Sequence, residues 1–181
     1  MSRQPKMKSV KAEVAVVMGS DSDWPILEET VNTLESFGVG CDVRVMSAHR
    51  TPDLAATFAR KAAGQGIKVI IAAAGGAAHL AGVICAHTTL PVIGIPVTSA
   101  FMNGLDSLLS TVQMPAGVPV ATVATGKAGA VNAAILEVQI IALGRPELAR
   151  RLVVHKQSLM DKVNAGNDRI QSEIVKKRAK A

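Results

Sequence analysis

Short apolar runs alternate with helix-like segments along the chain, and this alternation limits the fold more than any other feature. The runs are rich in Val, Ile and Ala and cover residues 13–18, 41–46, 68–74, 90–95 and 118–124. Strands that alternate with helices are joined by right-handed crossovers, so this order predicts a parallel sheet with helices on both faces. We expect a three-layer, doubly wound α/β domain with a flavodoxin-like strand order.

The helical segments are recognised by the spacing of their apolar side chains and by their ends. Residues 24–37 form one apolar face and stop at Gly38, whereas residues 52–63 open with Pro52 and stop at glycine. Further helices are expected at residues 79–88, 105–114 and 128–143. A last helix opens at Pro146, and its final dozen residues are expected to fray.

The net charge of +6 comes from the two ends of the chain. The expected organisation is a basic N-terminal segment over residues 1–11, the α/β domain over 12–144, and a C-terminal helix with a basic tail over 145–181. A basic tail can contact nucleic acid, but a solvated tail explains the same charge. One Trp, three Phe and no Tyr offer little for base stacking, so we expect no nucleic-acid partner.

The composition favours a soluble protein of the cytoplasm. Two cysteines are too few for a disulfide framework, and the basic start is not followed by a signal-peptide core. Residues 69–86 lack charged side chains, but Gly75, Gly76 and His79 interrupt them, so a buried strand and helix fit better than a membrane span.

Two helices are too apolar for the surface of a monomer. Residues 79–88 carry no charge, and residues 128–143 carry only Glu137. A helix that is apolar on all sides must be buried on all sides, and a domain of this size has little interior to cover both. We therefore predict a tight homo-oligomer in which subunits cover each other's helices.

Ligands of doubly wound sheets bind beyond the carboxyl ends of the strands, so the loops that follow the strands are the candidate site. These loops contain more Gly, Ser, His and Arg than turns require; they cover residues 19–24, 47–52, 75–79, 96–104 and 125–132. Ser20, Ser22 and Asp23 can cap the next helix, or the serines and free N–H groups can bind a phosphate. Asp23 would repel phosphate and is expected to accept hydrogen bonds from ribose hydroxyls.

His49 and Arg50 form the second candidate group. Arg supplies fixed donors for a phosphate, and His exchanges a proton near neutral pH. A purely structural role for His49 stays open. His79 opens an apolar helix, where a structural hydrogen bond or a ligand contact would explain it. Cys41 and Cys85 do not have the setting of nucleophiles.

Other functions of this fold class fit the loops poorly. The first loop lacks a dinucleotide-binding G-x-G-x-x-G, and Gly126-Lys127 lacks the upstream Gly and the Ser or Thr of a P-loop. Residues 73–75, where the third run ends, are Ala-Ala-Gly and lack the Asp of a phosphorylated receiver domain. Only Trp24 could stack on a flavin, and metal-ligand spacing is missing. A phosphorylated small molecule, a glycine-lined pocket and a mobile proton remain.

Five ordered motifs resemble the N5-carboxyaminoimidazole ribonucleotide mutase family. They are Met-Gly-Ser-Asp-Ser-Asp-Trp (18–24), Ser-Ala-His-Arg-Thr-Pro (47–52), Ala-Gly-Gly-Ala-Ala-His-Leu (74–80), Asp-Ser-Leu-Leu-Ser-Thr-Val-Gln-Met-Pro (106–115) and Gly-Lys-Ala-Gly-Ala-Val-Asn-Ala-Ala (126–134). The resemblance covers residues 12–155. It implies a three-layer α/β fold, a homo-octamer and a cofactor-free, metal-free isomerase of de novo purine biosynthesis.

The resemblance also implies roles for individual residues. His49 matches the catalytic histidine that moves a carboxylate from the exocyclic nitrogen of the substrate to ring carbon four, by decarboxylation and recarboxylation. The loop of Gly75, Gly76, Ala77, His79 and Leu80 would line the site that holds CO2. The implied partners are a ribonucleotide substrate, CO2 and the ATP-dependent synthetase that makes the substrate. The residues expected to hold the ribose and phosphate are Ser20, Ser22, Asp23, Ser47 and Arg50.

Two alternatives stay open at this point. A second class of the same family carboxylates aminoimidazole ribonucleotide directly with CO2 and gives the same product. A binding module without catalysis would need the loops but would not use His49 as a proton carrier.

Overall fold

The computed structural model describes residues 12–179, and the chain separates into two compact units, one up to Ile140 and one from Ile141. The first unit is a five-stranded parallel sheet of order β2-β1-β3-β4-β5. Its strands are β1 (Val14–Met18), β2 (Cys41–Val45), β3 (Val69–Gly75), β4 (Val92–Val97) and β5 (Ala121–Thr122). The doubly wound, flavodoxin-like prediction is therefore confirmed.

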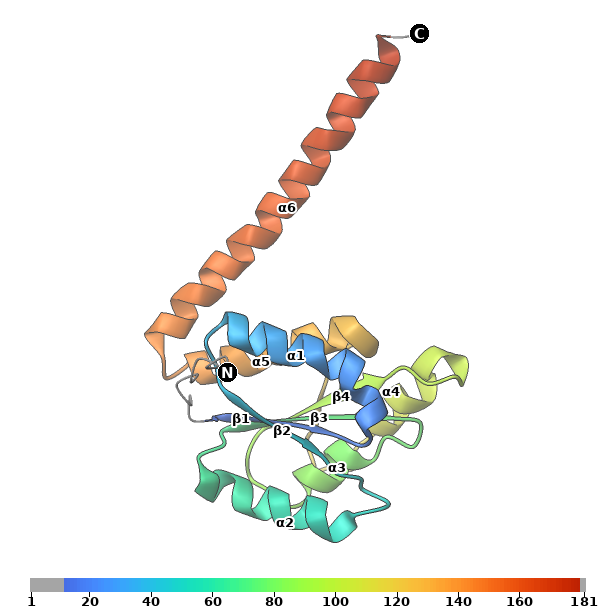
Figure 1. Ribbon diagram of the computed structural model, residues 1–181, viewed down its shortest axis with the longest axis vertical. Coiled ribbons are helices and arrows are strands. Elements are labelled where there is room, and N and C mark those ends of the chain that lie inside the picture. The colour runs from blue at the N-terminus through green and yellow to red at the C-terminus, as the bar shows by residue number, and fades with distance from the viewer. Residues whose placement is uncertain (1–11, 180–181) are drawn as a thin grey trace, which may run out of the picture. The chain divides into compact units, whose positions relative to one another are not determined.

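Helices cover both faces of the sheet, as Figure 1 shows. On one face lie α1 and α5, and on the other lie α2 and α3. A side chain at Gly94 in β4 would meet both Ala81 of α3 and Thr111 of α4, which places α4 on the same face as α3. The helices are α1 (Trp24–Ser36), α2 (Pro52–Ala62), α3 (Leu80–Cys85), α4 (Leu105–Val112) and α5 (Gly126–Ala142), with short 3-10 turns at Asp21–Asp23, Ala63–Gln65 and Met102–Gly104.

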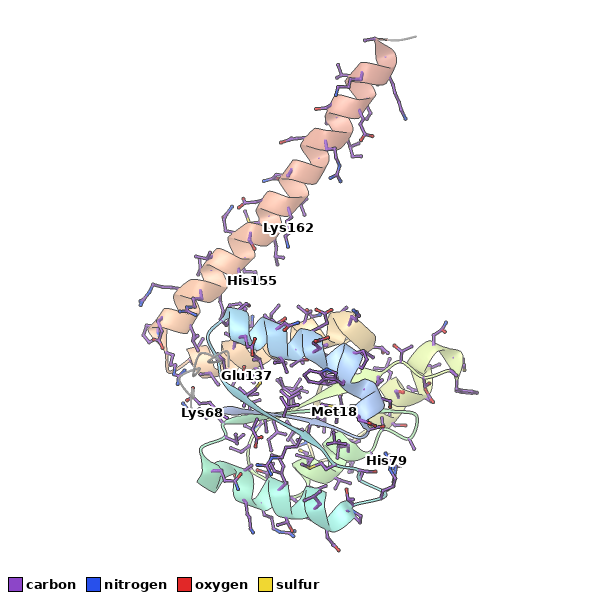
Figure 2. All side chains as sticks on the ribbon, in the orientation of Figure 1. Met18, Lys68, His79, Glu137, His155 and Lys162 are labelled. Carbon is purple, nitrogen blue, oxygen red and sulfur yellow. The ribbon has the colours of Figure 1, made fainter. Side chains whose placement is uncertain are left out.

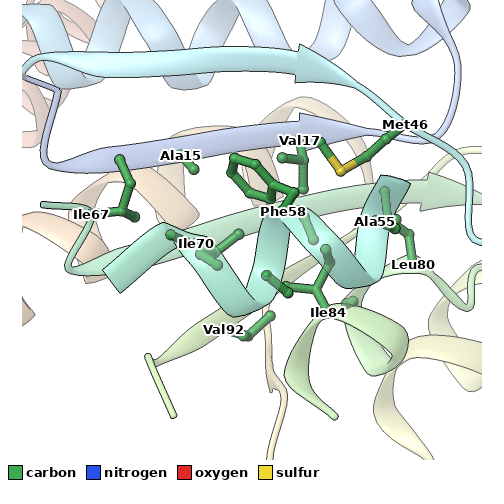
Figure 3. Close-up of a cluster of buried hydrophobic side chains, with 14 residues drawn as sticks. Ala15, Val17, Met46, Ala55, Phe58, Ile67, Ile70, Leu80, Ile84 and Val92 are labelled. Carbon is green, nitrogen blue, oxygen red and sulfur yellow. The ribbon is translucent and has the colours of Figure 1, made fainter. Parts of the chain in front are cut away.

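The core lies between the sheet and its helices. Every residue of β1 and β4 is buried, which explains why these strands are continuous apolar runs rather than alternating ones. On the face covered by α2 and α3, Phe58 packs among aliphatic side chains from the strands (Figure 3). This burial fixes the inner strands, so that their carboxyl ends are held together at one edge.

The fifth strand is much shorter than the predicted run of residues 118–124. Pro119 lies inside that run and has no N–H to give to a ladder, so a regular strand is confined to Ala121–Thr122. The N–H of Val118 instead closes a turn on the carbonyl of Pro115. The predicted helix over residues 79–88 is likewise shorter, and its regular part is Leu80–Cys85.

The second unit contains the long helix α6 (Pro146–Arg178), and here the prediction of fraying is wrong. The helix continues to Arg178, and its last turn carries Lys176, Lys177 and Arg178, which suit the negative end of the helix dipole. The basic segment 1–11 lies outside the described residues, and the division at residues 144 and 145 stays a prediction. Among residues 12–179, no helix combines the length and the apolar character that crossing a membrane would require.

Gly129 tests the packing of α5 against the loop that precedes it. A Cβ at this position would run into the carbonyl of Ala124, and backbone cannot move aside as a flexible side chain can. We expect Gly129→Ala to lower the free energy of unfolding by about 1–3 kcal/mol. Gly64→Ala is the matched control, because a Cβ there meets nothing within 4 Å. Equal melting temperatures for the two variants in a thermal denaturation series would contradict this account.

Candidate active site at the carboxyl edge of the sheet

A cavity of about 440 Å³ lies at the carboxyl ends of β1, β2 and β3. This volume is in the usual range for a small-molecule site. Figure 2 shows the ends of the sheet: Met18, the last residue of β1, and His79 lie toward one, and Lys68 lies at the other. The cavity is lined by Gly19, Ser20, Ser22, Asp23, Ser47, Ala48, His49, Arg50, Ala74, Gly75, Ala77 and Leu80. Of the predicted site residues, only Gly76 and His79 do not line the cavity.

The first loop caps the 3-10 turn Asp21–Asp23 that leads into α1, and it also faces the cavity. The Ser20 hydroxyl accepts from the N–H of Ser22 at 3.3 Å, and the N–H of Ser20 donates to Asp23 Oδ2 at 3.2 Å. The Ser22 hydroxyl donates to the Ser20 hydroxyl at 2.9 Å. This capping box holds the turn rigid and leaves its serines at the cavity wall. Capping by this loop is therefore compatible with the predicted phosphate contact of its serines.

Asp23 is a largely buried carboxyl at the base of this loop. Burial raises the pKa of Asp23 above its usual value, and hydrogen bonds from Ser20 and Ser22 and the charge of Arg50 oppose that rise. An acceptor held in this way suits hydroxyl donors of a ligand rather than an anionic group.

The second loop is folded on Ser47. Its hydroxyl oxygen accepts from the N–H groups of His49 at 3.2 Å and of Arg50 at 3.1 Å, so the hydroxyl proton remains available for a ligand. Thr51 closes the loop by accepting from the N–H of Ser47 at 2.9 Å. The guanidinium of Arg50 donates through Nη2 to the carbonyl of Gly19 at 2.8 Å, which ties the second loop to the first. Arg50 lines the same cavity as Ser20, Ser22 and Ser47, so its other N–H groups can serve as donors to an anion bound there.

His49 and His79 are in direct contact, a feature that the sequence did not predict. His49 Nε2 lies 2.8 Å from His79 Nδ1, and the rings meet edge to face with centroids 4.9 Å apart. One of these two nitrogens must carry the shared proton and the other must accept it. His79 therefore orients the His49 ring, and a proton can pass between the two rings.

Helix α4 holds the glycine loop (residues 75–80) that follows β3. Gly76 has a φ of +65°, a conformation that favours glycine. Its N–H donates to the Ser107 hydroxyl at 2.9 Å, and its carbonyl lies 3.3 Å from the Ser110 hydroxyl. These two contacts hold Gly76, which lies between the cavity-lining residues Gly75 and Ala77. The motif at residues 106–115 was recognised in the sequence, but no role for its serines could be predicted.

The remaining candidates lie outside the cavity. Lys127 Nζ is 3.1 Å from Glu29 Oε1, and burial raises the thiol pKa values of Cys41 and Cys85, which disfavours the nucleophilic thiolate. In the part of the chain that the structure describes, no three His, Cys, Asp or Glu side chains are grouped closely enough to hold a metal ion.

Comparison with known proteins gives one consistent family. Residues 13–162 match the family described as AIR carboxylase. N5-carboxyaminoimidazole ribonucleotide mutase of Mycobacterium tuberculosis is 51% identical over 161 residues, which cover 89% of this chain and 91% of that protein. The Bacillus subtilis enzyme of the same name is 50% identical over 157 residues, which cover 87% and 97%.

Solved structures agree with the sequence relatives. The crystal structure of Treponema denticola PurE superposes with a TM-score of 0.76 at 27% identity, covering 83% of this chain and 92% of that chain. The family match spans most of the chain, and both sequence relatives are about half identical over nearly their full length. The chain belongs to the AIR carboxylase family.

Proposed function

We propose that this protein is an isomerase that converts N5-carboxyaminoimidazole ribonucleotide into 4-carboxy-5-aminoimidazole ribonucleotide in de novo purine biosynthesis. One observation carries the proposal: a single cavity combines anion donors, a buried carboxyl and a histidine held for proton transfer. Relatives that are about half identical and carry the mutase name support the same activity. The residue roles below are part of the proposal.

The ribose phosphate would occupy the space between the first two loops. Ser20, Ser22 and Ser47 offer hydroxyls there, and Arg50 offers the positive charge that a phosphate requires. Asp23 would accept hydrogen bonds from the ribose hydroxyls. This placement directs the imidazole ring toward His49 and the glycine loop.

His49 would give one proton and take another. As the bond between the exocyclic nitrogen and the carboxylate carbon breaks, its electron pair stays on nitrogen, which takes a proton from His49 and becomes an amine. CO2 is released into the cavity. Ring carbon four then attacks CO2, and the proton on that carbon returns to His49, which restores aromaticity. Atoms and charges balance without a cofactor or a metal, and His79 keeps the ring oriented throughout.

The small residues of the third loop would retain CO2 between the two steps. Gly75 and Ala77 line the cavity without charge, and Leu80 closes it with an apolar side chain. A free CO2 molecule makes few contacts, so a confined volume that keeps it beside carbon four supplies the reactivity as a proximity effect.

Two reactions run side by side distinguish this function from its alternatives. The pure protein receives freshly made N5-carboxyaminoimidazole ribonucleotide in one, and aminoimidazole ribonucleotide with bicarbonate in the other, both without ATP. We expect the carbon-four carboxylate at a high rate in the first reaction only. Fast product in the second would indicate the direct carboxylase, which the names of the relatives do not favour. If neither reaction gives product while the ligand still raises the melting temperature, the protein is a binding module.

The raised pKa of Asp23 predicts how substrate affinity depends on pH. Because the pKa lies above the usual value, Asp23 takes up its proton at a higher pH than a free Asp does. The affinity for the ribonucleotide should therefore fall as the pH is lowered through that pKa, since a protonated carboxyl is a weaker acceptor. Asp23→Asn should bind weakly at every pH and lose this dependence. An unchanged pH profile of Kd in the variant, measured by calorimetry, would contradict the role of Asp23.

The assembly and the cellular setting complete the proposal. Val43 and Val45 of β2 and Leu109 and Val112 of α4 are exposed, and neighbouring subunits of a homo-octamer would cover such side chains. We place the protein in the cytoplasm, in functional linkage to the ATP-dependent synthetase that makes its substrate. Light scattering should give eight times the chain mass of 18.8 kDa, and a monomer would contradict the assembly.

A further inference from the structure

Helix α4 lies outside the cavity, yet it holds the loop that forms one cavity wall. The N–H of Gly76 donates to Ser107 Oγ at 2.9 Å, and Ser107 is fully buried. A Cβ at Gly76 would meet nothing within 4 Å, so the site has room for a side chain and only the φ of +65° favours glycine there. The hydrogen bond to Ser107 therefore fixes the turn that brings Ala77 to the cavity wall.

Asp106 accepts from both donors of Ser107 and favours one direction of its hydroxyl. Its Oδ1 accepts from the Ser107 N–H at 2.8 Å and from the Ser107 hydroxyl at 3.4 Å. With its proton directed toward Asp106, the Ser107 oxygen presents a lone pair to the N–H of Gly76. Hydrogen bonds thus link Asp106 to Ser107, and Ser107 to Gly76.

Ser99 anchors Asp106 from the loop that follows β4. Its hydroxyl donates to Asp106 Oδ1 at 2.6 Å, the shortest bond of this group. This bond lowers the pKa of Asp106 below its usual value, so the carboxylate stays an acceptor through the neutral range. Ser110 contributes less to holding Gly76. Its hydroxyl donates at 2.7 Å to the carbonyl of Asp106 and lies 3.3 Å from the carbonyl of Gly76.

We propose that Asp106 and Ser107 are positioning residues that hold the glycine loop in place at the cavity wall and thereby keep CO2 in the cavity between decarboxylation and recarboxylation. This inference rests on the proposed function. The two residues touch neither the cavity nor the reacting atoms, and they act through the Gly76 peptide. His79 lies three residues beyond Gly76, so the same support also steadies its contact with His49.

The test measures how the substrate is divided between two fates. Freshly made N5-carboxyaminoimidazole ribonucleotide is supplied without added bicarbonate. Released aminoimidazole ribonucleotide and the carbon-four carboxylate are then quantified, with an enzyme-free blank for spontaneous decay. Ser107→Ala removes the acceptor of the Gly76 N–H. We expect released amine per carboxylated product to rise several-fold and kcat to fall by roughly tenfold. KM should change little, because the phosphate contacts come from the other two loops.

Thr111→Val is the matched control. Thr111 is buried one turn further along α4, and its hydroxyl donates at 2.7 Å to the carbonyl of Ser107 without touching the glycine loop. Its product ratio should equal that of the wild type. Asp106→Asn should raise the ratio of released amine to carboxylated product by less than Ser107→Ala does. If Ser107→Ala fails to fold, Asp106→Asn tests the positioning role in its place.

The outcomes separate the two claims. Wild-type conversion together with wild-type product ratios in the folded Ser107→Ala and Asp106→Asn variants would overturn only the positioning role. An equal rise in Thr111→Val would also overturn it, because any lost hydroxyl in α4 would then suffice. A wild-type protein that makes no carboxylated product would overturn the proposed function, and the positioning role with it.

Discussion

Replacing His49 by asparagine is expected to lower kcat by roughly a thousandfold, within the range that a general acid–base group contributes. Asparagine is too short to keep the contact that His49 Nε2 makes with His79 Nδ1, and it cannot carry a proton to the substrate nitrogen or remove one from carbon four. Substrate affinity should remain close to that of the wild type, because the serines, Asp23 and Arg50 are unchanged.

The same substitution at His87 is the control for His49→Asn. His87 follows α3 and lies near Arg60, with Nδ1 at 3.4 Å from Arg60 Nη1, and does not line the cavity. His87→Asn should keep wild-type kcat. Stopped-flow conversion of the substrate measures kcat, and calorimetry of the inactive variant measures Kd. Retained turnover in His49→Asn would remove His49 from the mechanism.

Replacing Arg50 by glutamine is expected to have the second largest effect, this time on binding. A hydrogen bond to a charged group contributes about 1.5–3 kcal/mol, so KM should rise by roughly 10- to 100-fold. Two consequences add to this: the tie between Arg50 and the carbonyl of Gly19 is lost, and so is the charge that opposes protonation of Asp23. Because no group that moves a proton is removed, kcat should change much less than KM.

A substrate analogue without the phosphate isolates the role of Arg50. If Arg50 binds the phosphate, Arg50→Gln should raise the Kd of the nucleotide much more than the Kd of the dephosphorylated nucleoside. Arg60→Gln controls for the general loss of an exposed positive charge. A penalty of equal size for nucleotide and nucleoside would show that Arg50 acts by holding the loop and not by binding phosphate.

The arrangement of the loops could be predicted because it depends on strand order alone. The strands that precede Ser20, Ser47 and Gly75 are apolar runs joined by helices, so their carboxyl ends meet at one edge whatever the details of packing. The starts of α2 and α6 could also be predicted, because Pro52 and Pro146 occupy their first turns. Pro119 could have signalled the short fifth strand, because a residue without an N–H interrupts a ladder.

Contacts between side chains from different loops could not be predicted in this way. His49 and His79 are 30 residues apart on loops of strands that are not neighbours. Only the three-dimensional path of both loops brings His49 Nε2 within 2.8 Å of His79 Nδ1. The support of Gly76 by Ser107 likewise depends on how α4 packs. In the sequence, Ser107 is one polar position in a helix. The local pattern therefore predicts which loops line the cavity, and the tertiary structure determines which of their side chains are in contact.

Intramolecular transfer of the carboxylate is the central claim, and a labelling experiment tests it most directly. N5-carboxyaminoimidazole ribonucleotide carrying ¹³C in its carbamate carbon is converted by the pure protein in the presence of unlabelled bicarbonate, and the product is examined by ¹³C NMR. Retention of the label at the carbon-four carboxylate is the expected result. An unlabelled product, with the ¹³C recovered in bicarbonate, would contradict the account, because CO2 would then enter the product from solution.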